Sequence, residues 1–434
     1  MVTPRIFKGT RDFLPDEMVG REKLIDTIKD VFRKYGFLPM ETPSMEFMEI
    51  LAGKYGDDEK LIYKLAYKGG NELALRYDLT VPLSRAMGMN PHLHKPFKRY
   101  QIQPVWRADR PQLNQGRYRE FYQCDADTIG TTDLLADAEV IALTNDILVK
   151  LGFTGYKIRI NHRRLLSGLI EYAGFPQGEE SNVCRSLDKL LKIGWDGVKT
   201  ELSDKGYDAA CFDRLTYLLN SVTIGQLDSP IFSENENLEI GAAEMREVRT
   251  YCRSMGIADE NLHFDLTLAR GLNYYTGCIY ESKLDAAPHI GSLTGGGRYD
   301  NLIGTFSKND IPAVGTTIGL DRIMTAMKQL EMPMGGTTTT EVLVVVFGDD
   351  TRADNVKLVS KLRKDGVQAE IFLGSAKMKR QFEYADRKGI PLVAMQGDEE
   401  IAAGTVKIKN MQSGDQQHVP LSGLADKVRE ILAK

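Results

Sequence analysis

Two long alternating segments constrain the fold of this chain more than any other feature of its sequence. The segments "FKRYQIQPVWRADR" and "GRYREFYQCDADTIG" carry the aromatic and alternating residues typical of strands, and a loop containing Pro, Gly and Asn joins them. They therefore predict a long antiparallel hairpin. Because residues of like parity project from one face of a strand, Arg119, Phe121, Gln123, Asp125 and Asp127 share a face. That face is too polar for a core, and it predicts either the floor of a site or an exposed sheet face.

Other segments add helices and strands around this hairpin. An amphipathic helix is expected from about Asp16 to Tyr35, because apolar residues recur at three- and four-residue spacing and Gly36 ends the pattern. Strand texture follows in "FLPMETP" and in "LALRYDLTVPL", where Asp78 and Thr80 would share a polar face. It returns in "LHFDLTLARGLNYYTGCIYE", and "PAVGTTIGLDRIMTAMKQL" reads as a strand that runs into a helix.

The pattern along the chain predicts more than one domain. With 434 residues the chain exceeds one ordinary domain, and residues 161–255 turn helical and more polar, as an inserted subdomain would. Residues 335–340 read "GGTTTT", a flexible linker. The apolar run "VLVVVF" then predicts a strand covered on both faces, within a separate α/β domain at 341–434. Residues 1–330 form the other domain, which contains the insertion.

Composition excludes several classes of protein. Hydrophobic residues make up 42% and charged residues 27%, as in globular proteins, and no apolar run is long enough to span a bilayer. The start of the chain lacks the pattern of a signal peptide, so we expect a cytoplasmic protein with no membrane partner. The 5 cysteines show no C-x-x-C spacing, and the 6 histidines suggest no ligand set, so we expect reduced thiols and no structural metal.

Any bound nucleotide must be held by side chains, because the sequence has neither a phosphate-binding G-x-x-x-x-G-K-S/T loop nor a clean G-x-G-x-x-G. Arginine suits this task, since its planar guanidinium binds phosphate oxygens in pairs and stacks on flat rings. Three arginines lie at informative places: Arg107 at the end of a strand, Arg270 in "LARGLNYY", and Arg322 at the start of a helix. Most arginines are solvated or paired at the surface, so only the combination points to a function.

Six segments resemble a known family. "FKRYQIQPVWRADRPQ" with "GRYREFYQCDADTIG" looks like motif two of the class II aminoacyl-tRNA synthetases, and "AVGTTIGLDRI" looks like motif three. The segments "KGTRDFLP", "LRYDLTVPL", "LARGLNYYTG" and "GGGRYDNL" are similar to segments specific to histidyl-tRNA synthetases. The resemblance covers essentially the whole chain.

The resemblance implies a fold and an assembly. It implies an α+β catalytic domain on an antiparallel sheet of six or seven strands, a helical insertion, and a C-terminal α/β anticodon-binding domain. A homodimer would form through the first helix and strand. The activity would be that of a histidine–tRNA ligase, which joins histidine to tRNA(His) at the expense of ATP.

The resemblance also assigns roles in ATP binding. Arg107 would hold the α-phosphate, while Phe121 and Arg322 would stack on the two faces of the adenine. Arg270 would lie across the α-phosphate and stabilise the charge that grows there during attack by the histidine carboxylate. Magnesium would bridge the β- and γ-phosphates, carried with ATP rather than in a site of its own.

The amino acid would be recognised by residues from several motifs. Asp78 and Thr80 resemble the residues that receive the α-amino group, and Gln123 the residue near the α-carboxylate. Asp127 and Tyr275 would satisfy the two imidazole nitrogens, one of them an obligate acceptor and the other able to donate or accept. The remaining members of this expected site are Arg270, Tyr274, Tyr299 and the run Gly295, Gly296 and Gly297.

This chain departs from many bacterial relatives, which have R-P-E-G-T where it reads "RYDLT" and a glutamate at the place of Asp127. Two alternatives remain. One is a non-catalytic relative, the regulatory subunit of ATP phosphoribosyltransferase, which typically lacks the C-terminal domain and the arginine of "LARGLNYY". The other is a class II synthetase for another amino acid, which would keep Arg107 and Arg322 but not "LARGLNYYTG".

Overall fold

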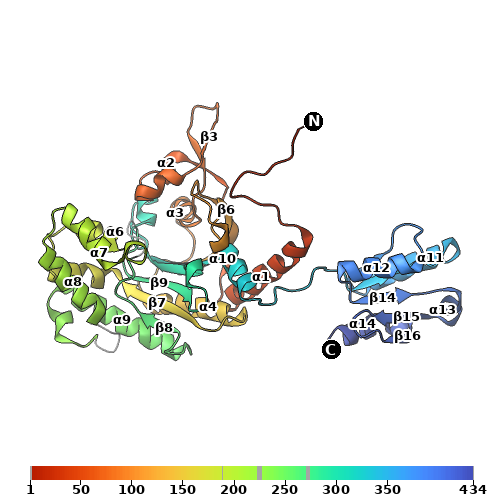
Figure 1. Cartoon of the computed structure of the whole chain (residues 1–434). Helices are drawn as coiled ribbons and strands as arrows, with labels where there is room; N and C mark the ends of the chain where they lie inside the picture. Colours follow the sequence, from red (N-terminus) through yellow and green to blue (C-terminus); the bar gives the residue numbers. More distant parts are fainter. Residues whose placement is uncertain (1, 188, 222–226, 270–273, 434) are drawn as a thin grey trace. The chain divides into compact units, whose positions relative to one another are not determined.

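The computed structural model describes residues 2–187, 189–221, 227–269 and 274–433, and the chain divides into two compact units. The large unit comprises Met1–Arg11 and Leu24–Met332, and the small unit comprises Asp12–Lys23 and Pro333–Lys434 (Figure 1). Helix α1 (Pro15–Lys34) therefore contributes residues to both units. None of the helices in the described ranges has the length and apolarity that crossing a bilayer requires.

A mixed sheet of eight strands forms the centre of the large unit, in the order β1, β5, β6, β11, β10, β9, β7, β8. The six inner strands pair antiparallel. The edge strands β1 and β8 pair parallel with β5 and β7. These two short strands bring the sheet above the six or seven strands that the family resemblance implied. The bounds are β1 Leu38–Pro39, β5 Phe97–Trp106, β6 Glu120–Ile129, β11 Ala313–Gly319, β10 Thr294–Arg298, β9 Cys278–Leu284, β7 Tyr156–His162 and β8 Leu262–Phe264.

Several sequence predictions are confirmed here. Strands β5 and β6 form the expected long hairpin, in register from Phe97 opposite Ile129 to Trp106 opposite Glu120. The helix expected at 16–35 is α1, and strand β11 runs directly into helix α10 (Leu320–Gln329). Within the described part of 262–281, the predicted strand is confirmed in β8 and in the first part of β9. Residues 270–273 of this segment lie outside the described residues.

One face of the large sheet is apolar and is covered by helices. Phe32 of α1 packs on Tyr100 of β5, with ring centroids 5.3 Å apart. Helix α4 (Leu135–Lys150) lies against β11, where the hydroxyls of Thr144 and Thr316 are 3.1 Å apart. The opposite face carries the polar residues predicted from strand parity, and it remains open for a site.

The helical insertion follows strand β7. It contains α5 (Arg163–Tyr172), α6 (Glu180–Leu187), α7 (Leu190–Asp204), α8 (Ala209–Ser221), the short 3-10 helix η4 (Pro230–Ser233) and α9 (Glu236–Ser254). Helix α9 packs on α5 and α4, so it ties the insertion to the apolar face of the sheet. Residues 161 and 162 still belong to β7.

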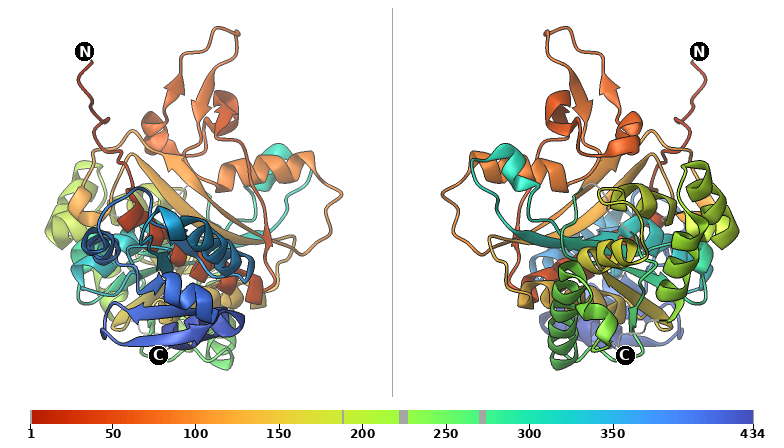
Figure 2. Two further views of the ribbon diagram at one scale, coloured as in Figure 1. Left: turned by 90° about the vertical axis from the view of Figure 1, so that its right-hand side faces the viewer. Right: turned by 90° about the vertical axis from the view of Figure 1, so that its left-hand side faces the viewer.

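The prediction of a strand throughout "LALRYDLTVPL" was wrong. Only β4 (Leu73–Leu75) is extended, and Thr80 begins helix α3 (Thr80–Met89). Asp78 does not lie on a strand either. Its carboxylate accepts the backbone N–H of Val81 and so satisfies a free amide of the first helical turn. Strand β4 joins β2 (Met45–Phe47) and β3 (Lys64–Leu65) in a small sheet beside α2 (Met48–Leu51), seen at the top of Figure 2.

The small unit has its own five-stranded sheet in the order β13, β12, β14, β15, β16. Buried side chains on one face of this sheet pack on α11 and α14, and those on the other face pack on α12. The prediction of a strand covered on both faces is confirmed for β12, the first half of "VLVVVF", whereas Phe347 at the end of the run is exposed. Strands and helices alternate except at β15 and β16, which form an antiparallel pair. The bounds are β12 Val342–Val344, α11 Asp349–Lys364, β13 Ala369–Ile371, α12 Met378–Lys388, β14 Leu392–Met395, α13 Asp398–Ala403, β15 Thr405–Asn410, β16 Gln416–Pro420 and α14 Leu424–Leu432.

Candidate active site

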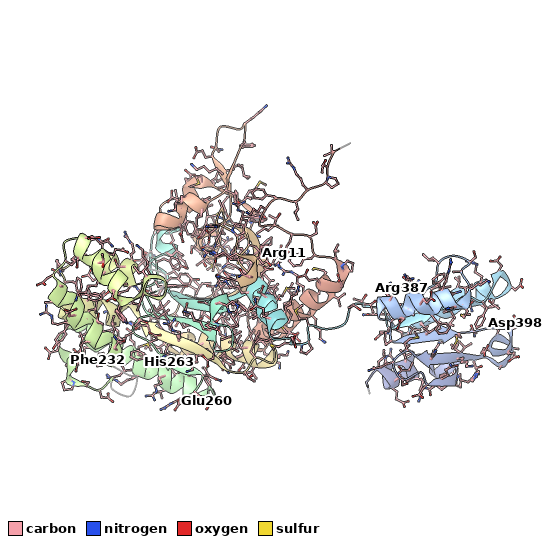
Figure 3. All side chains as sticks on the ribbon, in the orientation of Figure 1. Arg11, Phe232, Glu260, His263, Arg387 and Asp398 are labelled. Carbon is pink, nitrogen blue, oxygen red and sulfur yellow. The ribbon has the colours of Figure 1, made fainter. Side chains whose placement is uncertain are left out.

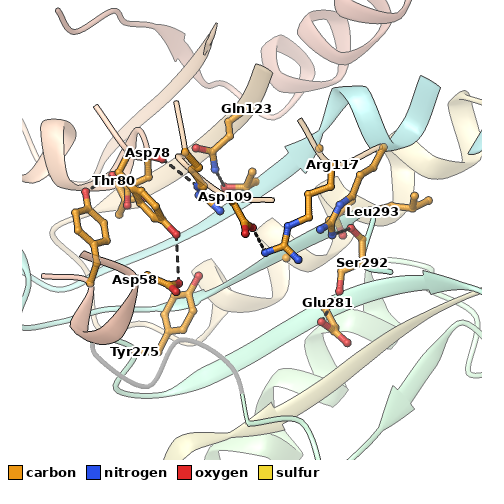
Figure 4. A pocket seen from close by; sticks show the side chains of 18 of the residues that line it. Asp58, Asp78, Thr80, Asp109, Arg117, Gln123, Tyr275, Glu281, Ser292 and Leu293 are labelled. Atoms are coloured by element: carbon orange, nitrogen blue, oxygen red, sulfur yellow. Dashed lines mark hydrogen bonds and ion pairs between the residues drawn. The ribbon is translucent and has the colours of Figure 1, made fainter. Parts of the chain in front are cut away.

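A cavity of about 660 Å³ opens on the polar face of the large sheet (Figure 4). Its lining comes from the hairpin, from strands β9, β10 and β11, from the start of α10 and from the segment around α3. Of the residues predicted from the sequence, the cavity brings together Asp78, Thr80, Arg107, Phe121, Gln123, Tyr274, Tyr275, Gly295 and Arg322. The parity prediction of a polar face is thus confirmed, and this face is the floor of a cavity.

Three predicted nucleotide residues lie in this lining. The Arg107 Nε–H donates to the carbonyl of Tyr77 at 3.1 Å, which orients the guanidinium. Its guanidinium carbon lies 4.2 Å from the Tyr77 ring centroid and 5.2 Å from that of Phe121. Arg322 is fixed in the same manner, because its Nη1 donates to the carbonyl of Ser292 at 2.7 Å. Two oriented guanidinium groups and an aromatic ring therefore face one cavity.

Asp78 lies among aromatic side chains and close to Arg107, which donates to the carbonyl of the preceding residue. Its Oδ1 accepts the Tyr55 hydroxyl at 3.0 Å and the Val81 N–H at 3.1 Å. Burial raises the pKa of Asp78, and burial together with the nearby Asp78 carboxylate raises the pKa of Tyr55 well above its ordinary value. The Tyr77 hydroxyl donates to Asp58 at 3.2 Å (Figure 4). A hydrogen-bonded carboxylate in this position suits an amino group.

Gln123 of strand β6 also lines the cavity. Its amide Nε2 donates to Thr317 Oγ1 at 3.4 Å, a long contact. Its Oε1 and the Asp125 Oδ1 are buried polar atoms without a hydrogen-bond partner among the described residues. Because an unpaired buried polar atom costs free energy, the Gln123 Oε1 atom favours a polar ligand in the cavity that Gln123 lines.

Asp127 and Tyr299 lie beneath the cavity and are absent from its lining. The Tyr299 hydroxyl donates to Asp127 Oδ1 at 2.5 Å, and Asp127 Oδ2 lies 2.8 Å from Nη2 of the fully buried Arg99. Burial raises the pKa of Asp127, and the Arg99 guanidinium opposes this rise. Arg99 stands directly opposite Asp127 in the hairpin, so the pair spans β5 and β6.

Two adjacent tyrosines close one side of the cavity. Tyr274 and Tyr275 have ring centroids 4.5 Å apart, and the Tyr274 ring meets that of Tyr299 edge-on at 6.4 Å. Arg270, which the sequence predicts as a catalytic residue, lies outside the described residues.

The predicted glycine run is largely explained by packing. A Cβ on Gly296 would come within 2.0 Å of the Gly315 carbonyl oxygen, and one on Gly297 within 2.7 Å of the Cys278 carbonyl oxygen. A Cβ on Gly315 would come within 1.9 Å of Asp127 Oδ1. Gly295 alone of the run lines the cavity.

Several charged residues of the site were not predicted from the sequence. Arg117 forms an ion pair with Asp109 in the loop of the hairpin, as Figure 4 shows. Arg159 Nη1 lies 2.7 Å from Glu281 Oε1. Strand parity could have identified Arg159 and Glu281 as members of the site. They lie directly opposite each other on β7 and β9, on the face of the sheet that carries Asp127.

The lining offers no ready cage for a metal ion. No group of three or more metal-ligating side chains suited to an ion occurs in the described part of the chain. The carboxylates of the lining each have a partner: Asp58 with Tyr77, Asp78 with Tyr55, Asp109 with Arg117, Glu281 with Arg159 and Asp321 with Arg11.

A largely antiparallel sheet with a floor of arginine, aromatic and amide side chains, a helical insertion and a separate α/β unit defines the class II aminoacyl-tRNA synthetase architecture. Comparison with known proteins gives the family. A family model described as histidyl-tRNA synthetase matches residues 9–323, and one described as anticodon binding domain matches residues 341–431. The chain belongs to the histidyl-tRNA synthetase family.

Individual relatives agree along the full length. The chain is 40% identical to a histidine–tRNA ligase of Cytophaga hutchinsonii, over 99% of this chain and 100% of the relative. It is 43% identical to that of Gloeobacter violaceus, over 95% and 96%. A crystal structure of histidyl-tRNA synthetase from a Nostoc species superposes with a TM-score of 0.89 at 31% identity, over 99% of this chain and 100% of that one.

A further solved structure shares the fold. A structure described as an ATP phosphoribosyltransferase regulatory subunit/histidyl-tRNA synthetase from Bacillus halodurans C superposes with a TM-score of 0.73 at 24% identity, over 88% of this chain and 97% of that one. At that identity the likeness concerns the fold alone.

Proposed function

We propose that this chain is a histidine–tRNA ligase. It would activate histidine with ATP, giving histidyl-adenylate and pyrophosphate, and then transfer histidine to the 3' end of tRNA(His). The observation that carries the proposal is that one cavity has Arg107, Phe121 and Arg322 in its lining together with Asp78 and Gln123. The chain also belongs to this family along its full length.

The adenosine and the α-phosphate would bind at the hairpin side. Phe121 and Arg322 both offer flat faces, which suits them to stack on the two sides of an adenine. Arg107, oriented by the Tyr77 carbonyl, would bind the α-phosphate, and Arg270 is proposed as the second guanidinium that stabilises the charge developing there. As the carboxylate oxygen of histidine attacks the α-phosphorus, the bond to pyrophosphate breaks.

The amino acid would bind at the Asp78 side. Asp78 and Thr80 would receive the α-amino group, and the unpaired Gln123 Oε1 lies on the same floor, so Gln123 is proposed near the α-carboxylate. Tyr275, with Tyr274 beside it, would meet the imidazole directly. Asp127 remains our proposal for the second imidazole nitrogen, since a carboxylate that accepts from Tyr299 and pairs with Arg99 still has acceptor capacity. Tyr299 would hold Asp127 in place.

Magnesium would arrive with ATP. Mg²⁺ usually keeps several waters and binds through phosphates with one or two carboxylates, so it does not need a cage made by protein alone. The lining carboxylate that suits it is Glu281, which already pairs with Arg159 and accepts the Ser292 hydroxyl at 2.5 Å. The ion would offset the charge of the β- and γ-phosphates.

The small unit is proposed to bind the tRNA anticodon. We propose residues 1–330 as the catalytic domain with the insertion at 161–255, residues 335–340 as the linker and residues 341–434 as the anticodon-binding domain. Helix α12 supports an RNA-binding role, since Lys379 and Arg380 are exposed on it and have no ion-pair partner among the described residues. The 5 cysteines are all free and buried, which fits the reducing cytoplasm that we propose as its location.

We further propose that the protein is a homodimer. Apolar side chains in the segment that follows α1 are exposed, with Leu38 of β1 60% and Met45 of β2 57% accessible. Covering such a surface with a second copy would stabilise both. Sedimentation at micromolar concentration should give twice the chain mass, and a stable monomer would contradict this proposal.

The function is tested by exchange of pyrophosphate into ATP with each standard amino acid in turn. We expect exchange with histidine alone, and only with magnesium present. Equal exchange with another amino acid would indicate a different synthetase. No exchange with any amino acid, from a folded chain, would indicate the non-catalytic alternative.

A further inference from the structure

The N-terminal segment at residues 7–11 packs on the loop that joins β5 and β6. The carbonyl of Gly9 accepts the Arg119 N–H at 2.8 Å, and the carbonyl of Lys8 accepts Arg119 Nη1 at 3.0 Å. Gly9 has a φ of +92°, and a Cβ there would come within 2.6 Å of Pro111 Cγ. This close approach fixes the segment against the base of the loop.

Arg11 extends from this segment to two further parts of the chain. Its guanidinium carbon lies 3.6 Å above the ring centroid of Tyr118, and it forms an ion pair with Oδ1 of Asp321. Asp321 Oδ2 accepts the backbone N–H of Tyr122 at 2.8 Å. Arg11, labelled in Figure 3, therefore joins the start of the chain, the hairpin and helix α10.

The two partners of Arg11 both line the cavity, whereas Arg11 does not. Tyr118 lies three residues before Phe121, and Asp321 directly precedes Arg322. From outside the cavity, Arg11 thus contacts a loop residue close to Phe121 in sequence and the residue that precedes Arg322. Phe121 and Arg322 are the two side chains that we propose to stack on the adenine. The planar guanidinium can stack on a ring and form an ion pair at once, which an ammonium group cannot reproduce.

We propose that Arg11 is a positioning residue for the nucleotide side of the site. This rests on the proposed function, because it takes Phe121 and Arg322 as adenine ligands. Without Arg11, the loop and the first turn of α10 lose one of the contacts that join them, and ATP binds less tightly. The hydrogen bond from the Tyr122 N–H to Asp321 Oδ2 remains. The amino-acid side is held by α3 and by the hydrogen bond of Tyr55 to Asp78, so it does not depend on Arg11.

The test compares Arg11→Gln with a control that removes a similar ion pair elsewhere. Arg85 pairs with Glu46 at 2.5 Å, with 19% and 6% of the two side chains accessible, against 21% and 2% for Arg11 and Asp321. Full-length protein is titrated with ATP alone by calorimetry, and the KM values for ATP and histidine are measured by pyrophosphate exchange.

We expect Arg11→Gln to weaken ATP binding about tenfold, the size of one lost cation–π contact with one charge-assisted hydrogen bond. The KM for histidine should stay within about twofold, Arg11→Lys should be intermediate, and Arg85→Gln should bind ATP like the unchanged protein. Selective loss of ATP affinity in Tyr118→Leu, which leaves the ion pair intact, would support the same role, and it serves if Arg11→Gln does not fold.

Three results would overturn the proposal. The first is normal ATP affinity in folded Arg11→Gln, or in folded Tyr118→Leu if Arg11→Gln does not fold. The second is an equal rise in both KM values, and the third is an equal loss in Arg85→Gln. A selective loss of ATP binding in a protein that shows no exchange with histidine would support the role of Arg11 and refute the proposed amino acid. ATP binding alone therefore separates the two failures.

Discussion

Replacing Arg76 by methionine should destabilise the large unit strongly. Arg76 is fully buried, and its guanidinium donates to three carbonyls and one amide oxygen: Pro104 O at 2.9 Å, Thr42 O at 2.6 Å, Pro43 O at 3.3 Å and Gln103 Oε1 at 2.7 Å. These bonds tie the segment after α1 to strand β5. Burial lowers the pKa of Arg76, because the charged guanidinium loses hydration. Part of the free energy of these hydrogen bonds therefore offsets that loss.

The magnitude follows from these contacts. A hydrogen bond to a charged group contributes about 1.5–3 kcal/mol, so the three short bonds contribute roughly 4.5–9 kcal/mol before the cost of burying the charge. Arg76→Met leaves buried oxygen atoms without their donor, each at a cost of about 1–3 kcal/mol, and we expect a net loss of about 3–5 kcal/mol. Arg76→Lys should recover less than half, because a lysine cannot direct donors to both segments.

The assay is urea unfolding followed by tryptophan fluorescence and circular dichroism. Trp106 is a local reporter, since the Arg76 guanidinium carbon lies 5.6 Å from its ring centroid. Arg33→Met is the control, because the Arg33 side chain is 61% accessible. A loss below about 1 kcal/mol in Arg76→Met, or one equal to that of Arg33→Met, would show that water satisfies these carbonyls equally well.

Three further predictions concern the site and the small unit. Arg270→Ala should lower the rate of adenylate formation about 10²- to 10³-fold in single-turnover assays, with Arg270→Lys rescuing it only partly, and a folded variant of near-normal rate would refute its catalytic role. Burial raises the pKa of Asp125 to about 8, so the folded chain keeps a proton that the unfolded chain releases near pH 4. The free energy of unfolding should therefore fall as the pH rises from about 4 to about 8, and Asp125→Asn should flatten this slope; an unchanged slope contradicts the assignment. Replacing both Lys379 and Arg380 by glutamate should weaken tRNA aminoacylation about tenfold, because these exposed cations would contact phosphates, while pyrophosphate exchange is unchanged. An aminoacylation rate equal to that of the unchanged protein, or an equal loss in aminoacylation and exchange, would exclude that role.

Local patterns predicted the parts of the fold whose surroundings are simple. Helix α1, the hairpin of β5 and β6, and the buried strand β12 each show in sequence the periodicity that their burial requires. Strand parity also placed Phe121, Gln123 and Asp127 on one polar face, which the structure confirms.

The sequence pattern gave a wrong prediction where a short apolar run is compatible with both a strand and a helix. "LALRYDLTVPL" contains the apolar and β-branched residues of a strand, but its second half is the start of α3. The signal that could have found the helix is Asp78, whose carboxylate accepts the Val81 N–H, together with Pro82 in the first turn. Tertiary packing of α3 on α2 and on the short 3-10 helix at Ile303–Phe306 favours the helix.

Depth and distant contacts could not be predicted. Parity gives the face on which Asp127 lies, but not that Arg99 and Tyr299 enclose it beneath the cavity. Arg99 stands opposite Asp127 only in the register that a long loop allows, and no local signal fixes that register. Arg11 and Asp321 are 310 positions apart in the sequence, so no sequence pattern could predict that they form an ion pair.

The packed glycines limit how this protein could be redesigned for other amino acids. Any side chain at Gly315 would displace the Asp127 carboxylate, and any at Gly296 would strike the backbone of the neighbouring strand. Mutant libraries that vary these two positions would consist mostly of misfolded variants. Selection for an enlarged or reshaped form of the proposed amino-acid pocket should instead vary Gln123, Thr317 and Tyr275, whose side chains line the cavity.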